Sequence, residues 1–339
     1  MRKRIFKRCF TALFIAMVAL QAGSAVSTEN LRGDVNCSGS CGTDDLAALI
    51  NYLLAGATPP ALWLADIDGN GVMNMDDLTA LINYLLTGEW LWPDPVPPSP
   101  PEDAWVFTVN GVSFAMIHVE GGTFMMGNEG HNTATPVHQV TLSSYWIGET
   151  EVTNELWHAV MGEYHACDLQ PVRMRSWDEC QEFISRLNEM TGMTFSLPTE
   201  AQWEFAARGG NLSHGYKYSG SDNLDEVGWY VENSEAGIFQ PVVKTKLPNE
   251  LGLYDMSGGA WEFCQDCFRN YYYETDPVVD PLYYIEWILG PTNYIEVRGG
   301  DFQSYDRFCA VWYRYGAQQA DHWGGMRLAL WPDPVTQGK

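Results

Sequence analysis

Two short helices with the same apolar pattern are predicted near the start of the chain. Each carries four apolar residues at helical spacing: Leu46, Leu49, Ile50 and Leu53 in the first, and Leu78, Leu81, Ile82 and Leu85 in the second. The segment 45–56 returns as 77–88 with an offset of 32 residues, and each copy ends in a glycine suited to a helix C-terminus. The sequence therefore predicts an internal duplication whose two helices pack against each other.

A strand pattern begins after residue 103. Residues 105–109 and 112–119 flank Asn110-Gly111, a pair that readily takes the positive backbone angles of a tight hairpin turn. Before them, residues 93–101 hold six prolines, which favour an extended and fairly stiff spacer. We expect a small all-α module over residues 31–89, a linker over 90–103, and a second domain over 104–333 that opens with strands.

Two further helices are predicted where a capping box stands in the sequence. Ser176 is followed by Glu179, and Thr199 by Gln202, and both arrangements satisfy free amide groups at a helix start. Glycine marks the end of each helix, at Gly192 and at 209–210. Long periodic runs are otherwise few, so we expect an irregular α+β domain in which loops form much of the mass.

The first 25 residues have the pattern of a secretory signal peptide. A basic start precedes the apolar stretch 10–20, and small residues follow at 23–25. The apolar stretch is too short to span a bilayer as a stable helix. We therefore expect an exported protein, secreted or associated with the cell surface, without a membrane span.

The acidic composition excludes one class of partner. The formal net charge of −24 would become −29 on removal of the signal segment, which holds five basic residues and no acidic one. Such a chain is an unlikely partner for nucleic acid. Many acidic residues stand in spaced clusters that suit cations, and the remainder form a solvated acidic surface.

The loops before the two repeated helices carry oxygen-bearing residues at the spacing of calcium ligands. A hard divalent cation needs about six to eight oxygens, and a glycine at the sixth loop position permits the necessary bend. Ser40 and Val72 would contribute backbone carbonyls. The predicted ligands are Asp34, Asn36, Ser38, Ser40 and Asp45 in the first loop, and Asp66, Asp68, Asn70, Val72 and Asp77 in the second.

This duplication, with an aspartate closing each loop, resembles dockerin type I modules. The resemblance implies a small calcium-dependent fold that docks onto a cohesin-type receptor. Recognition residues in such modules lie at positions matching Thr43, Asp44, Met75 and Asp76. The alternative is a stabilising calcium clamp with no cohesin partner.

The second domain resembles the sulfatase-modifying factor, or formylglycine-generating enzyme, family. The phrases that carry the resemblance follow one another in the family's order: 121–127 (GGTFMMG), 145–154 (YWIGETEVTN), 197–210 (LPTEAQWEFAARGG), 252–262 (GLYDMSGGAWE), 298–300 (RGG) and 325–328 (GMRL). The resemblance implies a variant of the C-type lectin fold with little regular structure.

The family enzyme uses two cysteines that bind copper(I), oxygen and a sulfatase cysteine. Alignment on Arg298-Gly-Gly puts Ser304 at the first cysteine position and Cys309 at the second. Soft thiolates suit copper(I), whereas a serine hydroxyl is a hard and weakly acidic group. Cys309 is therefore the one candidate catalytic residue, and its alternative is a buried thiol or a disulfide partner of Cys264.

Two other sites are implied in this domain. Family members bind calcium at positions matching Asp255, Gly258, Ala260 and Glu262, although the family's usual Asn is replaced by Gly259. The region after Arg298 is rich in aromatic residues, and such rings suit sugar or peptide ligands. The alternative is that about half of these rings belong to the core. The candidate ligand-binding residues are Tyr305, Phe308, Trp312, Tyr313, Tyr315 and Trp323.

The sequence thus favours a secreted calcium-binding protein that takes part in adhesion or in a polysaccharide-degrading assembly. Its N-terminal module would anchor the chain, and its C-terminal domain, without catalysis, would bind a glycan or a protein. The alternative is a copper-dependent formylglycine-generating oxidase that acts on exported sulfatases. In either case calcium is the expected metal, and copper is expected only in the second.

Overall fold

The computed structural model describes residues 33, 41–55, 67, 75–89, 100–101, 103–162, 169–234, 237, 241–268, 277–283, 294–319 and 324–331. The chain divides into two compact units, Met1–Pro97 and Pro98–Lys339, and each is described by itself. The predicted signal segment, most of the predicted linker, eight of the ten predicted loop ligands and Trp323 lie outside the described residues.

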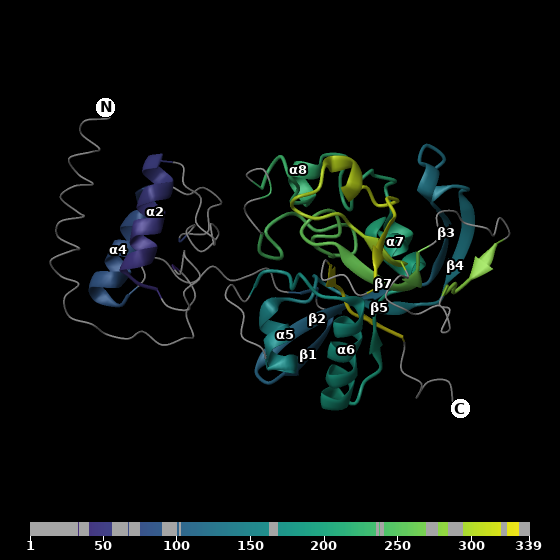
Figure 1. Ribbon diagram of the computed structural model, residues 1–339, viewed down its shortest axis with the longest axis horizontal. Coiled ribbons are helices and arrows are strands. Elements are labelled where there is room, and N and C mark those ends of the chain that lie inside the picture. The colour runs from purple at the N-terminus through teal and green to yellow at the C-terminus, as the bar shows by residue number, and fades with distance from the viewer. Residues whose placement is uncertain are drawn as a thin grey trace. The chain divides into compact units, whose positions relative to one another are not determined.

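The first unit contains the two predicted helices. Helix α2 spans Thr43–Ala55 and helix α4 spans Met75–Thr87 (Figure 1). The repeated apolar positions meet in one small core, where Leu49 and Leu81 are fully buried against Ile67. The Gly88 amide donates to the Tyr84 carbonyl and has a positive φ of 75°, so the glycine ends α4 as predicted.

A five-stranded antiparallel sheet forms the base of the second unit. Its order is β1 (Trp105–Val109), β2 (Val112–Val119), β5 (Tyr145–Gly148), β12 (Ala329–Leu330) and β6 (Phe195–Ser196). The predicted hairpin is confirmed: Val109 pairs with Val112, and Asn110 and Gly111 have φ values of 48° and 90°. Helices α5 and α6 pack on this sheet.

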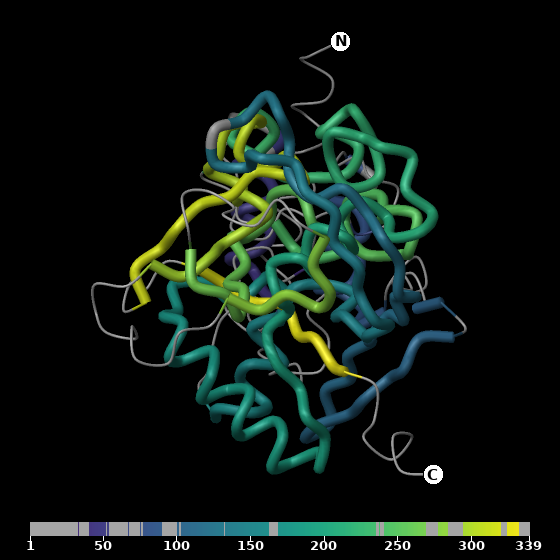
Figure 2. The backbone as a smooth tube through the Cα atoms, turned by 90° about the vertical axis from the view of Figure 1, so that its right-hand side faces the viewer, coloured from purple at the N-terminus to yellow at the C-terminus, as the bar shows by residue number. Residues whose placement is uncertain are grey.

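Two smaller sheets complete the domain. One has the order β10 (Tyr315–Gln318), β9 (Tyr294–Arg298), β7 (Glu262–Cys267) and β11 (Gly325–Met326); the other has β3 (Gly122–Met126), β4 (His138–Leu142) and β8 (Val278–Val279). Strands β11 and β12 are separated by two residues yet join different sheets. The yellow end of the chain therefore passes through the middle of the domain in Figure 2.

The second unit has four helices among the described residues, and the two that the sequence predicts, α6 and α7, begin at their predicted caps. The four helices are α5 (Asn154–Met161), α6 (Trp177–Thr191), α7 (Glu200–Ala207) and the single turn α8 (Leu224–Val227), with 3₁₀ turns η1 (Asn132–Ala134), η2 (Gly210–Leu212) and η3 (Asp306–Cys309). Both predicted capping boxes are present, at Ser176 and Thr199. Gly192, with a φ of 70°, closes α6.

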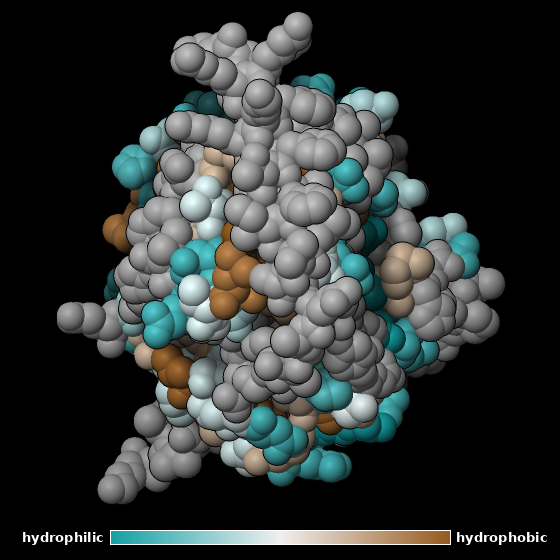
Figure 3. Space-filling view, turned by 90° about the vertical axis from the view of Figure 1, so that its left-hand side faces the viewer, coloured by the Kyte–Doolittle hydropathy of each residue, from teal (hydrophilic) through white to brown (hydrophobic). Residues whose placement is uncertain are grey.

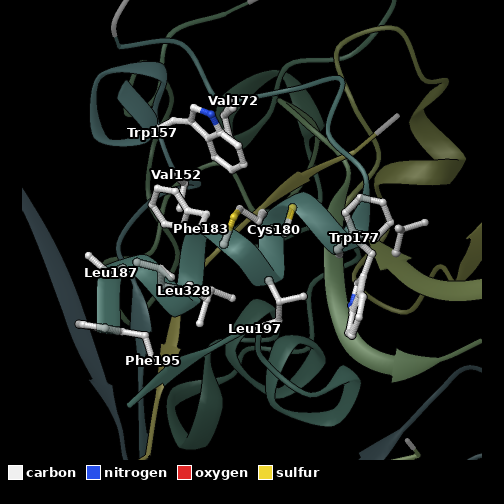
Figure 4. Packing of buried hydrophobic residues seen from close by; sticks show 14 of the residues in the cluster. Val152, Trp157, Val172, Trp177, Cys180, Phe183, Leu187, Phe195, Leu197 and Leu328 are labelled. Atoms are coloured by element: carbon white, nitrogen blue, oxygen red, sulfur yellow. The ribbon is translucent and has the colours of Figure 1, made fainter. Parts of the chain in front are cut away.

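The largest apolar core lies between α5, α6 and the sheets. Helix α6 buries Trp177, Cys180, Phe183 and Leu187, and Phe183 stacks on Trp157 of α5 with ring centroids 5.0 Å apart (Figure 4). Burying an apolar side chain of this size contributes about 1.5–3 kcal/mol. This packing fixes α5 and α6 on the five-stranded sheet.

Every residue of α7 is buried, so this helix runs through the interior. The mixed architecture, with short strands, few helices and long loops, confirms the predicted α+β class. Exposed apolar residues on the face seen in Figure 3 appear as separate brown patches among teal polar ones. Among the described residues, none of the helices is both long and apolar enough to span a bilayer.

Candidate ligand-binding and metal sites

The closing aspartate of each predicted calcium loop is buried at the start of its helix. Asp45 is 1% exposed and Asp77 is fully buried. The Gly42 amide donates to Asp45 Oδ2, and the Ile67 amide donates to Asp77 Oδ1, both over 2.7 Å. Buried carboxylates are stable only with hydrogen bonds or cations around them. The other predicted ligands, from Asp34 to Ser40 and from Asp66 to Val72, lie outside the described residues.

Cys309 lies in a closed apolar pocket. Its side chain is fully buried against Tyr218, Leu224, Val227 and Tyr230. Burial, followed by the neighbouring carboxylates of Asp301 and Asp306, raises the pKa of the Cys309 thiol. The thiolate is the form that binds metals and attacks substrates, and burial disfavours that form here.

Ser304, at the position of the family's first cysteine, is held in a turn. Its hydroxyl donates to Asp301 Oδ1 over 2.6 Å and accepts from the Asp301 amide over 3.2 Å. The Ser304 carbonyl accepts from the Val231 amide. The Ser304 hydroxyl thus has a structural role beside a carboxylate. Cys264, the alternative partner for Cys309, is likewise a buried thiol outside any disulfide.

The second predicted calcium site is a buried group of acids around one arginine. Both Glu262 oxygens accept from Arg327, and Glu262 Oε2 also accepts from the Trp203 indole over 2.7 Å. Asp255 Oδ2 accepts from the Lys244 amide, whereas Asp255 Oδ1 is buried with no hydrogen-bond partner. Glu262 is therefore engaged by Arg327, whereas Asp255 Oδ1 would be open to a cation.

Glu151 joins this group from the loop after β5. Its Oε1 accepts from the Ala260 amide, and its Oε2 is buried without a hydrogen-bond partner. A Cβ at Gly259 would lie 2.5 Å from Glu151 Oε1, so the carboxylate fills the space beside this glycine. Burial, followed by the charge of Asp255, raises the pKa of Glu151 well above its usual range.

The buried oxygens around Asp255 provide part of the ligand set that calcium needs. Burial raises the pKa of Asp255 to about 6, although the Lys244 amide and the charge of Arg327 oppose this rise. Across the described residues, no three His, Cys, Asp or Glu side chains are arranged to hold a metal. A calcium ion bound here would therefore draw on the carbonyls of Gly258 and Ala260 as well as on Asp255, and calcium accepts such mixed oxygen sets.

The acids of α7 form ion pairs inside the domain. Glu200 pairs with Arg314, and Glu204 pairs with Arg208 and Arg298. Although burial by itself would raise it, the pKa of Glu204 is lowered by these two arginines. The carboxylates of α7 are therefore held in buried ion pairs with arginine.

The predicted aromatic residues divide between surface and interior. Tyr305 and Tyr315 are 53% and 46% exposed, whereas Tyr313 is buried. Phe308 and Trp312 are half-buried and pack against the large core. Phe308 contacts Tyr313 edge to face with ring centroids 5.0 Å apart. Among the predicted ligand residues that the structure describes, Tyr305 and Tyr315 are thus the two exposed rings.

Three further residues lie beside these rings. His131 contacts Tyr313 with ring centroids 4.9 Å apart, and Trp261 lies 5.8 Å from Tyr315. Arg307 lies over the rings of Tyr305 and Phe308. Arg307 could have been found from the sequence, because it stands between the predicted ligand residues Tyr305 and Phe308. His131 and Trp261 come from distant segments, and no sequence pattern indicates that they lie beside these rings.

The irregular three-sheet domain, its internal helix and its ring-bearing loops define a C-type-lectin-like protein preceded by a loop–helix repeat. The chain belongs to the family of the sulfatase-modifying factor enzyme 1-like domain, whose model matches residues 108–331. The dockerin type I domain model matches residues 32–86. Both predicted resemblances are confirmed. Dockerin domains bind calcium and cohesins and are typically extracellular.

Relatives share this fold with different names. The chaperone protein LppX of Paenibacillus barcinonensis is 31% identical over 206 residues, covering 45% of this chain and 71% of that protein. The formylglycine-generating enzyme of Streptomyces coelicolor is 28% identical over 278 residues, covering 60% of this chain and 83% of that protein. The solved structure of Treponema denticola variable protein 1 is 27% identical in sequence, with a TM-score of 0.60. The match covers 68% of this chain and 100% of that one.

Proposed function

We propose that this protein is an exported binding protein: its dockerin module attaches it to a cohesin-type receptor, and its C-terminal domain holds a glycan or protein ligand at Tyr305 and Tyr315. The observation that carries the proposal is the state of Cys309. The residue that would have to act as a copper ligand is a fully buried thiol whose pKa is raised by that burial, and Ser304 stands where a second thiol is needed.

Calcium supports both halves of this proposal. In the N-terminal module it would bind to Asp45, Asp77 and the remaining loop oxygens. In the C-terminal domain it would bind to Asp255 with the Gly258 and Ala260 carbonyls, while Glu262 holds Arg327. A hard cation at each place would balance buried negative charge and fix the loops that carry the binding surface.

The first experiment tests binding. A glycan array and a pull-down from extracellular protein are probed with wild type, Tyr305→Ala and Tyr315→Ala. Tyr294→Ala is the matched control: Tyr294 is 50% exposed and pairs with Gln318, and Gln318 lies three residues beyond Tyr315, so the two tyrosines project from opposite faces of the β9–β10 pair. We expect the first two variants to lose binding and Tyr294→Ala to keep it.

The second experiment tests the oxidase alternative, which the similarity to the Streptomyces coelicolor enzyme favours. Purified protein is incubated with copper and a cysteine-containing sulfatase peptide, and the peptide is followed by mass spectrometry. We expect an unchanged peptide mass. Formylglycine formation that disappears in Cys309→Ala would overturn the proposed function.

A further inference from the structure

Arg307 has surroundings unlike those of any other described arginine. Every other arginine among the described residues forms an ion pair with a carboxylate: Arg173, Arg175, Arg186, Arg208, Arg298, Arg314 and Arg327. Arg307 is exposed, and within the described part of the chain it has no such carboxylate. In a chain with 43 acidic and 19 basic residues, Arg307 is, among the arginines that the structure describes, the one whose guanidinium stays open to another partner.

Two rings hold the Arg307 guanidinium in place. Its central carbon lies 4.3 Å from the centroid of Phe308 and 5.1 Å from that of Tyr305. Stacking on a ring covers a flat face of the guanidinium and leaves its N–H edge open, and that edge matches the two oxygens of a carboxylate. Less side-chain freedom is then lost when an anion binds.

The nearest acid in the sequence is directed elsewhere. Asp306 Oδ2 accepts from Lys217 Nζ and from the Tyr218 hydroxyl, both over 3.2 Å. Although burial opposes it, the contact with Lys217 lowers the pKa of Asp306. Asp301, the next acid toward the N-terminus, accepts from Ser304 and pairs with Arg173. These contacts keep both carboxylates engaged with other groups.

We propose that Tyr305, Arg307 and Phe308 form a subsite for the carboxylate of a uronic acid residue in a glycan. This inference rests on the proposed binding function and names its ligand class. A uronic acid ring carries a flat C–H face that can pack on an exposed tyrosine, and a carboxylate at one edge that can accept from a guanidinium.

The charge of the chain narrows the ligand further. A net charge of −24 repels a densely anionic polymer, whereas a single guanidinium suits one carboxylate in an otherwise neutral oligosaccharide. An acidic peptide would bring several flexible carboxylates to a surface with one arginine open to them. The geometry therefore favours a glycan with isolated uronic acid residues.

The test uses a panel of oligosaccharides, each present with free uronic acid groups and again with those groups reduced to primary alcohols. Full-length protein is titrated with both forms. We expect the acidic form of at least one member to bind, and its reduced form to bind about tenfold more weakly or worse, as loss of a charge-assisted bidentate pair implies. Binding should also weaken as salt is raised, because the subsite is exposed.

The variants are Arg307→Gln and Arg307→Lys, with Arg186→Gln as the matched control. Arg186 is an exposed arginine of α6 that pairs with Glu182. Arg307→Gln should abolish the preference for the acidic form, Arg307→Lys should keep part of it through its charge, and Arg186→Gln should keep all of it. A thermal melt confirms that each variant is folded.

Four outcomes would overturn the inference. If both forms bind equally, or if Arg307→Gln retains the preference, the subsite is wrong although the proposed binding function survives. If oligoglutamate binds through Arg307 and the panel does not, the ligand is a peptide. If neither the panel nor any protein binds at Tyr305, the proposed function fails together with this inference.

Discussion

At the scale of single residues, Gly300 explains why Cys309 is closed to solvent. Its φ of 74° lies in the left-handed region, and a Cβ on it would stand 2.7 Å from Cys309 Sγ and 3.1 Å from the Phe308 carbonyl. Glycine thus allows the backbone after Arg298 to lie directly against the thiol. The same contact joins the Arg-Gly-Gly motif to the turn η3, which carries Arg307 and Phe308.

We predict that Gly300→Ala destabilises the domain by about 2–4 kcal/mol, the sum of left-handed strain and a clash with a buried side chain. Gly162→Ala is the control, because Gly162 has a φ of 78° and nothing within 4 Å of its Cβ position. The control isolates the strain, which we expect to cost about 1 kcal/mol. Urea denaturation measures both, and equal losses would mean that Cys309 is not tightly covered.

At the scale of elements, Asp266 joins strand β7 to two other segments. Its Oδ2 accepts from the Glu200 amide at the first residue of α7, and its Oδ1 accepts from the Tyr283 amide. Burial, followed by the charge of Glu200, raises the pKa of Asp266 to about 7. The start of α7, which carries the ion pairs to Arg298 and Arg314, is therefore tied to a group that titrates near neutrality.

The pH dependence of stability follows from this shift. An unfolded aspartate has a pKa of about 3.9, so between about pH 4 and 7 the folded state binds a proton that the unfolded state releases. Its contribution to stability is full below that window, falls as pH rises by at most about 1.4 kcal/mol per unit, and levels off above 7.

Asp266→Asn should remove this slope. We expect the free energy of unfolding of the wild type, measured relative to the variant, to fall from pH 4 to pH 7 and then to stay constant. The exposed Asp103→Asn serves as control and should run parallel to the wild type. A difference between wild type and Asp266→Asn that does not change with pH would show that Asp266 is ionised throughout the range.

The helices, turns and strands differ in how well the sequence predicts them. The capping boxes at Ser176 and Thr199 and the Asn110-Gly111 turn were predictable because each depends on contacts within a few residues. The sheet order was not: β12 enters between β5 and β6 through pairings of Ala329 with Ile147 and Ser196, which no local pattern encodes.

The candidate site divides in the same way. Tyr305 and Tyr315 were predictable as a ring-rich stretch, but their exposure depends on which neighbours fall into the core. The engagement of Glu262 by Arg327 joins residues 65 positions apart, and the burial of Cys309 beneath Gly300 depends on backbone conformation. The motifs indicate which residues are candidates, whereas the tertiary contacts determine the role of each.

At the scale of the whole molecule, the two units have different sources of stability. The second unit has an extensive core around α6 and α7, whereas the first relies on a small cluster between α2 and α4. A module of fewer than 60 residues, as predicted over 31–89, needs additional stabilisation, and bound metal is a common source. Asp45 and Asp77 place buried carboxylates where calcium would supply it.

We therefore predict that calorimetry in calcium shows two transitions and that chelation lowers the transition of the N-terminal module far more than that of the C-terminal domain. Calcium at 100 times its dissociation constant stabilises a folded module by about 2.7 kcal/mol, so the lower transition should move with calcium concentration. Asp45→Ala and Asp77→Ala should reduce this dependence.

Asp44→Ala is the matched control, because Asp44 adjoins Asp45 but is exposed and should leave the calcium response intact. If the module docks as proposed, Asp44→Ala should instead weaken the affinity for the cohesin-type receptor at saturating calcium. If Asp44→Ala and Asp45→Ala altered the calcium response equally, burial would not be what distinguishes a metal ligand from a docking residue at the start of α2.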